Sequence, residues 1–420
     1  MYKYLIAVAI LTPLIGIWMV EGGEFAGSVG VQGYPNGASF AYAIYATAVV
    51  TIALICTSGR RRAAEVRVRA SEANALFRRF SNNLLILEIG FLVVFLFGFG
   101  AINVWLGRVE KSEFRTSFGQ FGAIPNSMSK FILPALVAYA SMLFRRSSRT
   151  TALKMRLAAN FMLAFVIGAS WGFKSTGMAS VLPALLLLNW RIRPIVLITL
   201  TLAFVASLIL FFFTFDVSLA EATDVQTFLL QRFTVLQGDV AWYIWDLHSA
   251  GQHFPNYWPT LLAGVGDKLL SAFGVSRSDS YEWMLYHYDW MITYLAGVPL
   301  DAIVEGHSIV ATPFAEGLIA GGLGGVAVFA LIAGVLTGWM YRFLDRSLRD
   351  GRDVSAALGA TYFCYNLLAW LISGTIVELF HISLLINFSS ALLILTAMRR
   401  VGIRTIPVSA RIPAAEPQRI

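Results

Sequence analysis

The chain has 420 residues, of which 57% are hydrophobic and 13% charged, and its formal net charge at pH 7 is +8. In soluble globular domains the charged fraction is about a quarter, so this composition excludes an ordinary soluble protein. It predicts an all-α, polytopic integral membrane protein.

Apolar runs that can cross a hydrocarbon core of about 30 Å as helices recur along the chain. We predict about ten spans, seven before a long outer segment and three after it. The predicted spans cover residues 4–20, 39–57, 84–104, 128–144, 157–173, 175–190, 195–215, 322–341, 355–373 and 379–398. No small-residue cleavage site follows the first run, so we interpret it as a retained helix and not as a signal peptide.

The interruption between spans 7 and 8 sets the predicted organisation. We expect a membrane domain over residues 1–215, an extracytoplasmic loop with amphipathic helices over 216–314, a second membrane domain over 315–398 and a cytoplasmic tail over 399–420. A loop of this length is usually functional. Its Trp and Tyr side chains suit the interface between lipid and water, and some are candidates for stacking on sugars. The candidate sugar contacts are Asp239, Trp242, Tyr243 and Glu305.

Basic residues are concentrated in loops that would share one side of the membrane. With the N-terminus in the cytoplasm, about 24 of the 32 Lys and Arg residues face the cytoplasm, as the positive-inside rule requires. We therefore predict cytoplasmic N- and C-termini. Contact with anionic headgroups accounts for the net charge, so we expect membrane lipids and no nucleic acid as partners of these loops.

A polar segment lies at the lip of the eighth predicted span, in EGHSIVATPFAEGLIAGGLGG, residues 305–325. If a helix begins at Pro313, Thr312 caps it and Glu316 lies one turn inside, near the positive end of the helix dipole. His307 can exchange a proton near neutral pH. The two residues are candidates for a general base and its orienting partner. The alternative is a loop histidine and a glutamate that only supports the cap.

Three cations at the outer side are candidates for holding a phosphate or pyrophosphate. Arg115 lies in an outer loop, Lys174 in a tight turn between two apolar runs, and Arg232 in an amphipathic stretch of the large loop. The alternatives are a surface arginine, a lysine at a helix end and a salt bridge between Arg232 and Asp239, which are two turns apart.

Glu88 lies inside the third predicted span. Buried carboxyl groups serve proton coupling in transporters, so this residue keeps a transporter possible. We expect instead that Glu88 pairs with a basic or amide group in the helix bundle. The two cysteines, Cys56 and Cys364, lie in or beside spans and predict neither a disulfide nor a metal site.

The chain contains no Walker loop, dinucleotide fingerprint, HExxH or GxSxG motif. We therefore expect no cofactor and no nucleotide, which leaves substrates already activated by attachment to a lipid. A glycan on polyprenyl pyrophosphate suits this chain, because its leaving group needs cations, its acceptor hydroxyl needs a base and its tail needs an apolar groove.

The order of these features resembles the O-antigen polymerase (Wzy-type) family of oligosaccharide repeat-unit polymerases, which is related to the O-antigen ligases. The resemblance rests on the outer loop around Arg115, the turn FKSTGMASVLPALLLL, the large late loop and the segment HSIVATPFAEGLIAGGLGGVAVFALIAGVLTGWMYRF. It covers nearly the whole chain. Lys174 departs from the arginine that the family pattern has in the turn.

The resemblance implies a multi-pass protein of the bacterial inner membrane that transfers a growing chain from undecaprenyl pyrophosphate onto the next lipid-linked repeat unit. Arg115, Arg232 and Lys174 would hold the donor pyrophosphate, and His307 or Glu316 would take the proton of the acceptor hydroxyl. A chain-length regulator and a flippase are expected partners. Alternatives are an O-antigen ligase, a membrane O-acyltransferase and a non-enzymatic glycan transporter.

Overall fold

The computed structural model describes residues 1–57, 70–109, 114, 123–171, 174–190, 235–276, 279–304, 309 and 311–403. Within these residues, eight helices are long and apolar enough to cross a membrane. The candidate spans are Tyr2–Glu21, Ala38–Thr57, Ser71–Gly98, Ile124–Arg146, Thr151–Ala169, Pro313–Asp350, Asp353–Ser373 and Ile376–Met398. The chain is thus an all-α, polytopic membrane protein, with one short hairpin of β1 (Phe25–Ala26) and β2 (Val31–Gln32) in the part described.

The eight helices coincide with eight of the ten predicted spans. The predicted span over 175–190 corresponds to α9 (Lys174–Leu188), a shorter apolar helix, and the one over 195–215 lies outside the described residues. The third span begins earlier than predicted, because α3 (Ala70–Val93) begins in polar sequence. Hydropathy alone does not assign such sequence to a membrane span.

The described chain divides into two compact units. Unit 1 comprises Met1–Ala64, Asn189–Gly351 and Gly359–Ile386, and unit 2 comprises Glu65–Leu188, Arg352–Leu358 and Asn387–Ile420. The connecting helices are α19 (Asp353–Tyr362), which leads through the π-helix η6 (Phe363–Leu367) into α20 (Leu368–Ser373), and α21 (Ile382–Ile403).

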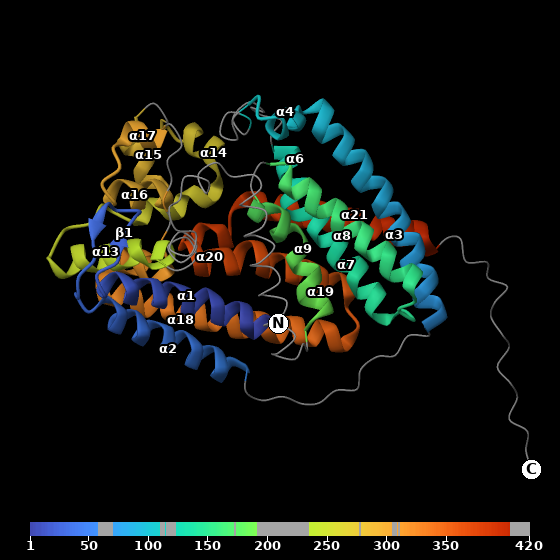
Figure 1. Ribbon diagram of the computed structural model, residues 1–420, viewed down its shortest axis with the longest axis horizontal. Helices are drawn as coiled ribbons and strands as arrows, with labels where there is room; N and C mark the ends of the chain where they lie inside the picture. The colour runs from blue at the N-terminus through green and yellow to red at the C-terminus, as the bar shows by residue number, and fades with distance from the viewer. Residues whose placement is uncertain are drawn as a thin grey trace, which may run out of the picture. The chain divides into compact units, whose positions relative to one another are not determined.

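Two helices of unit 1 pack along each other at very short range (Figure 1): α2 (Ala38–Thr57) and α18 (Pro313–Asp350). A Cβ atom at Gly334 would overlap Ile52, and one at Gly338 would overlap Cys56. Small residues four positions apart allow two helices to approach this closely. The resulting van der Waals packing stabilises the pair, because helices in lipid have no hydrophobic driving force for association.

The first helix, α1 (Tyr2–Glu21), packs against α13 (Leu236–Ser249), α2 and α20. Gly238 of α13 contacts the backbone of α1 at Pro13, where a side chain would not fit. The Tyr2 hydroxyl donates to the Thr337 carbonyl of α18 at 2.7 Å. Because Pro13 lies in the middle of a candidate span, α13 begins beside the membrane-crossing part of α1.

The helix α18 is broken at Gly321 and Gly322, where the backbone leaves the helical region. Gly322 has φ +59°, a left-handed value that glycine adopts without strain. The chain folds back so tightly there that Gly317 and Gly325 touch through their backbones. A short helix over residues 313–320 therefore precedes the long helix, and Glu316 belongs to the short one.

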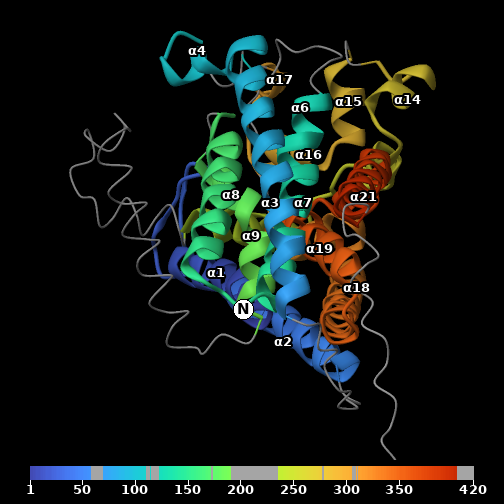
Figure 2. The ribbon, with the colours of Figure 1, turned by 90° about the vertical axis from the view of Figure 1, so that its right-hand side faces the viewer.

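The remaining helices of unit 1 form a small domain built around its own apolar core. Its elements are η5 (Trp258–Val265), α14 (Asp267–Ala272), α15 (Ser280–Tyr286), α16 (Tyr288–Leu295), α17 (Leu300–Val304) and η7 (Ile376–Leu379). The core contains Leu270, Trp283 and Val377. In Figure 2, as in Figure 1, α14 and α15 lie side by side. All of these helices except η7 lie in the segment 216–314 that the sequence predicts to be the extracytoplasmic loop.

Unit 2 is a bundle of α3, α7 (Leu133–Arg146), α8 (Thr151–Ala169) and α9, which pack against one another. The π-helix η1 (Val94–Gly98) and α4 (Ala101–Trp105) follow α3, and α6 (Ala123–Ser127) leads through the π-helix η3 (Met128–Ile132) into α7. A second apolar core at this end of the bundle contains Phe95, Phe114 and Trp171.

Candidate functional site

Glu316 is the centre of a buried polar cluster in unit 1. Its side chain is 0% exposed, and its carboxyl group accepts three hydrogen bonds. Oε1 accepts from the Tyr257 hydroxyl at 2.7 Å and from the backbone N–H of Ile376 at 2.9 Å, and Oε2 accepts from Trp370 Nε1 at 2.9 Å. Glu316 thus joins the residue before η5, α20 and η7 to the start of α18.

The donors around Glu316 favour the ionised carboxylate. An indole N–H and a backbone N–H can only donate hydrogen bonds. If Glu316 were protonated, its own O–H donor would compete with these donors for the same positions. Burial, the charge of Glu316 and the hydrogen bond to it raise the pKa of the Tyr257 hydroxyl above its usual value. Tyr257 therefore stays protonated and donates.

Three further hydroxyl groups lie in this cluster without a hydrogen-bond partner among the described residues: Tyr45, Tyr288 and Thr312. Each side chain is more than nine-tenths buried. Burial, followed by the charge of Glu316, raises the pKa of Tyr288 well above its usual value. Buried hydroxyls without partners cost free energy, so each one calls for an explanation such as a catalytic role or a bound water or ion.

The predicted helix start at Pro313 is confirmed, and Thr312 occupies the N-cap position. The prediction that the Thr312 side chain caps the helix is wrong. The Thr312 carbonyl accepts the first hydrogen bond, from the Glu316 N–H at 3.1 Å, and the hydroxyl makes no cap contact. Glu316 lies one turn inside the helix, as predicted.

Two of the predicted sugar contacts lie in the protein interior. Asp239 is fully buried, and its Oδ2 accepts from the Ser28 N–H at 2.9 Å, which ties α13 to the β1–β2 turn. Trp242 is also fully buried, and its Nε1 donates to the Tyr34 carbonyl at 3.2 Å. Tyr243 is half-buried. The surroundings of Asp239 and Trp242 give both a structural role, and their contact with sugar stays a prediction.

The other predicted site residues are not described in full. His307, Glu305, Arg115 and Arg232 lie outside the described residues, and so does the predicted ion pair of Arg232 with Asp239. Lys174 is the first residue of α9, and only its backbone is described.

Trp171 forms a second candidate site, in unit 2. Its Nε1 donates to Ser129 Oγ at 2.7 Å, and the Lys130 ammonium lies 5.7 Å from its ring centroid. Phe114 packs edge-on against Trp171, with 6.2 Å between the ring centroids. In the sequence, Phe114 directly precedes Arg115, and Trp171 comes shortly before Lys174. The described neighbours of two predicted pyrophosphate ligands therefore pack together.

Sequence reasoning missed Lys130, although a lysine inside a predicted span is a signal for function. Lys130 also lies in the π-helix η3, and π-helical turns are frequent at functional sites. Tyr257 and Trp370 were missed as well. No sequence signal distinguishes them from the other aromatic residues of a chain that is 14% aromatic.

Glu88 of α3 is 0% exposed, and neither carboxyl oxygen has a hydrogen-bond partner among the described residues. The described residues thus provide no basic or amide partner for Glu88, and the predicted pairing stays a prediction. The neighbouring helix α7 has no amide side chain and carries its basic residues only in its last turn, and Asn160 of α8 already donates to Ser81 at 2.7 Å.

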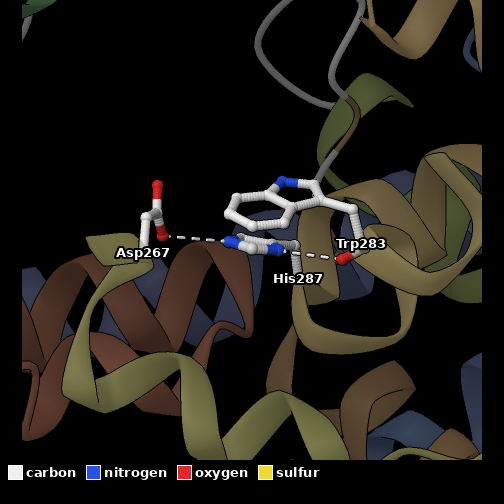
Figure 3. Close-up of polar contacts among 3 residues, drawn as sticks. All are labelled: Asp267, Trp283 and His287. Atoms are coloured by element: carbon white, nitrogen blue, oxygen red, sulfur yellow. Dashed lines mark hydrogen bonds and ion pairs between the residues drawn. The ribbon is translucent and has the colours of Figure 1, made fainter. Parts of the chain in front are cut away.

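His287, which follows α15, lies within hydrogen-bonding distance of Asp267 in α14 (Figure 3). Its Nε2 lies 3.2 Å from Asp267 Oδ1, and its Nδ1 lies 2.9 Å from the Trp283 carbonyl. The Trp283 ring stacks on the imidazole with 4.5 Å between centroids. Burial lowers the pKa of His287, but the contacts with Asp267 and Trp283 and the charge of Asp289 outweigh it, so the pKa is raised. Both ring nitrogens face acceptors, which suits the imidazolium.

Among the residues that the structure describes, no three His, Cys, Asp or Glu side chains gather as a metal site would require. Comparisons of the chain with protein-family models, with curated proteins and with solved structures found no match. What the protein does must therefore be argued from its own residues.

Proposed function

We propose that the protein polymerises oligosaccharide repeat units carried on polyprenyl pyrophosphate, at the periplasmic face of the bacterial inner membrane. The observation that carries the proposal is the Glu316 cluster, a buried carboxylate with three hydroxyls that have no hydrogen-bond partner among the described residues. Ionisable groups at such places are costly and are usually functional. The predicted base His307 precedes this cluster in the sequence.

The reaction joins two lipid-linked glycans without a nucleotide. The acceptor hydroxyl oxygen attacks the anomeric carbon of the donor, the bond from that carbon to the pyrophosphate breaks, and the lipid pyrophosphate leaves. Attack opposite the leaving group inverts the anomeric centre. The proton of the hydroxyl passes to a base, and cations stabilise the charge on the leaving pyrophosphate.

Of the two candidate bases, we propose His307, because the contacts of Glu316 do not suit the role. All three hydrogen bonds to Glu316 come from protein groups, and its side chain is fully buried, so it is not open to a substrate hydroxyl. In this proposal Glu316 is a positioning residue. It fixes the outer segment at Tyr257 and the backbone at Ile376 to the helix that follows the His307 loop.

Arg115 and Lys174 would hold the donor pyrophosphate, with Arg232 as a further cation. The packing of Phe114 on Trp171 supports a shared location for the first two, because each ring is close in sequence to one of the cations. Lys130 adds a third positive charge beside the Trp171 ring. Two phosphate groups need more than one cation, so the cluster suits a pyrophosphate better than a single phosphate.

The test is a gel of lipid-linked and surface glycans from cells in which the gene is deleted and then restored. We expect deletion to reduce a ladder to single repeat units, wild type to restore the ladder, and His307→Ala and Arg115→Ala to fail at unchanged protein level. Near-wild-type chain length in either mutant would exclude that residue. A ladder that has lost only acetyl groups would indicate an acyltransferase, and long chains left on the carrier lipid would indicate a ligase.

A proton-coupled transporter is the second candidate, and Glu88 is the observation that favours it. A fully buried carboxyl without a partner among the described residues suits a group that gains and loses a proton. If this reading holds, Glu88→Gln abolishes function while His307→Ala does not. In the polymerase the two substitutions have the opposite effects.

A further inference from the structure

The small outer domain of unit 1 exposes a continuous set of large apolar side chains. Phe273 is 75% exposed and Trp258 is 62% exposed. We call this set the outer apolar surface; its members are Trp258, Leu262, Leu269, Phe273, Phe380 and Ile382. Water-exposed surfaces of proteins rarely carry apolar patches of this kind unless something covers them.

The members are neighbours because two glycines bring their segments together. The ring of Phe380 lies where a side chain of Gly264 would be, and Ile382 lies against Gly266, which has φ +90°. These glycines form the turn from η5 into α14. The turn therefore sits directly on the residues that lead into α21.

The helix α14 has three distinct faces. Leu270 points into the core with Trp283 and Val377. Leu269 and Phe273, four residues apart and both exposed, share a second face. Asp267 and Ser271, also four residues apart, lie on a third, polar face and are exposed. An apolar exposed face beside a polar exposed face is the pattern of a helix that lies in a membrane interface.

The surface continues into a candidate span. Ile382 opens α21, and Leu385 and Ile386, one turn further, are exposed as well. These residues belong to the span Ile376–Met398, whose exposed apolar side chains face lipid. We infer that the outer apolar surface is immersed in the outer leaflet, with α14 lying in the plane of the interface and Leu269 and Phe273 among the acyl chains.

The chemistry of the surface fits lipid in two ways. Trp258 has the amphipathic ring that is enriched at membrane interfaces. No charged residue belongs to the surface, and Asp267 lies on the other face of α14, where headgroups and water can solvate it. The outer helices are thus seated on the bilayer next to α21. This inference does not depend on the glycan chemistry proposed above.

The test uses single-cysteine variants of the full chain in lipid nanodiscs. Cys56→Ser and Cys364→Ser give the background, and a nitroxide spin label is attached at Leu269→Cys, at Phe273→Cys or, as the matched control on the same helix, at Ser271→Cys. Collision with oxygen, which partitions into lipid, is compared with collision with a water-soluble nickel chelate.

We expect the labels at residues 269 and 273 to collide several-fold more with oxygen relative to nickel than the label at 271. Equal nickel access at 273 and 271 would overturn the inference, since the surface would then face water. Low access to both reagents at 273 would also overturn it, since protein would then cover the surface.

If a cysteine variant fails to fold, wild-type protein in nanodiscs that contain a lipid with a diazirine on its acyl chain gives the same reading. Photolabelling found by mass spectrometry between residues 258 and 273 supports immersion. Labelling confined to the spans contradicts it.

Discussion

Two buried carboxyl groups, Glu316 in unit 1 and Glu88 in unit 2, have opposite surroundings. Glu316 accepts hydrogen bonds from three segments of the chain, whereas neither oxygen of Glu88 has a partner among the described residues. Removing Glu316 leaves buried donors without an acceptor, and removing Glu88 leaves none. Burial alone therefore does not give a carboxylate its role. The number of donors fixed around it does.

The largest effect is expected for Glu316→Ala. Three donors lose their acceptor, and each buried unsatisfied donor costs about 1–3 kcal/mol, so we expect a loss of roughly 3 kcal/mol or more in the free energy of unfolding. The midpoint of thermal denaturation of the purified protein in detergent measures it. Glu24→Ala, at an exposed glutamate of the same unit, is the control. Equal midpoints for the two variants would show that the Glu316 contacts do not support the fold.

Removing a single donor sharpens the comparison. Tyr257→Phe deletes one hydrogen bond to Glu316 and keeps the aromatic ring, and Trp370→Phe deletes another but replaces the indole with a smaller ring. Hydrogen bonds to charged groups contribute about 1.5–3 kcal/mol, so each variant should lose less stability than Glu316→Ala. When combined with Glu316→Ala, either change should add little, because the contact is already gone. Full additivity in this double-mutant cycle would argue against the contact.

Glu88→Leu tests the other half of the comparison. Replacing an unpaired buried carboxyl by an apolar side chain of similar size removes a polar group from an apolar site. We predict an unchanged or higher midpoint of thermal denaturation. A fall as large as that of Glu316→Ala would mean that Glu88 does have partners in the native protein. Glycan chain length in the same variant separates the polymerase from the transporter.

The smallest effect concerns the pair formed by His287 and the exposed carboxylate of Asp267. The pKa of His287 is raised in the folded state, so its contribution is fully present below the unfolded value of about 6.5 and is lost as the pH rises through the folded value. We expect about 0.5–1 kcal/mol, because Asp267 is mostly exposed. The denaturation midpoint of wild type should fall relative to His287→Gln as the pH rises above 6.5. Parallel pH profiles would contradict it.

Hydropathy and helix-start rules predicted much of the architecture. Eight spans, the helix start at Pro313 and the position of Glu316 in its first turn follow from local patterns. The partners of Glu316 do not, because Tyr257, Trp370 and Ile376 are 54 to 60 residues away along the chain. Only tertiary packing brings them together. That no described residue pairs with Glu88 was equally beyond local rules, since it depends on which faces of α7 and α8 meet α3.

The break in α18 has a geometry that the glycine-rich sequence does not predict. Gly321 and Gly322 lie at the start of a predicted span, where small residues allow another backbone to approach closely. The structure uses these glycines to fold the helix back on itself, so that Gly317 meets Gly325. Composition marks a place where backbones can touch, but not which backbones do.

The most direct test of the central claim uses purified protein in nanodiscs with one defined substrate, a repeat unit on undecaprenyl pyrophosphate, and no nucleotide. We predict a ladder of longer glycans and the release of one undecaprenyl pyrophosphate for each linkage formed. His307→Ala should abolish both, and Glu316→Gln should reduce both in parallel with the amount of folded protein. Unchanged substrate in the presence of folded wild-type protein, or a ladder that persists in His307→Ala, would contradict the account.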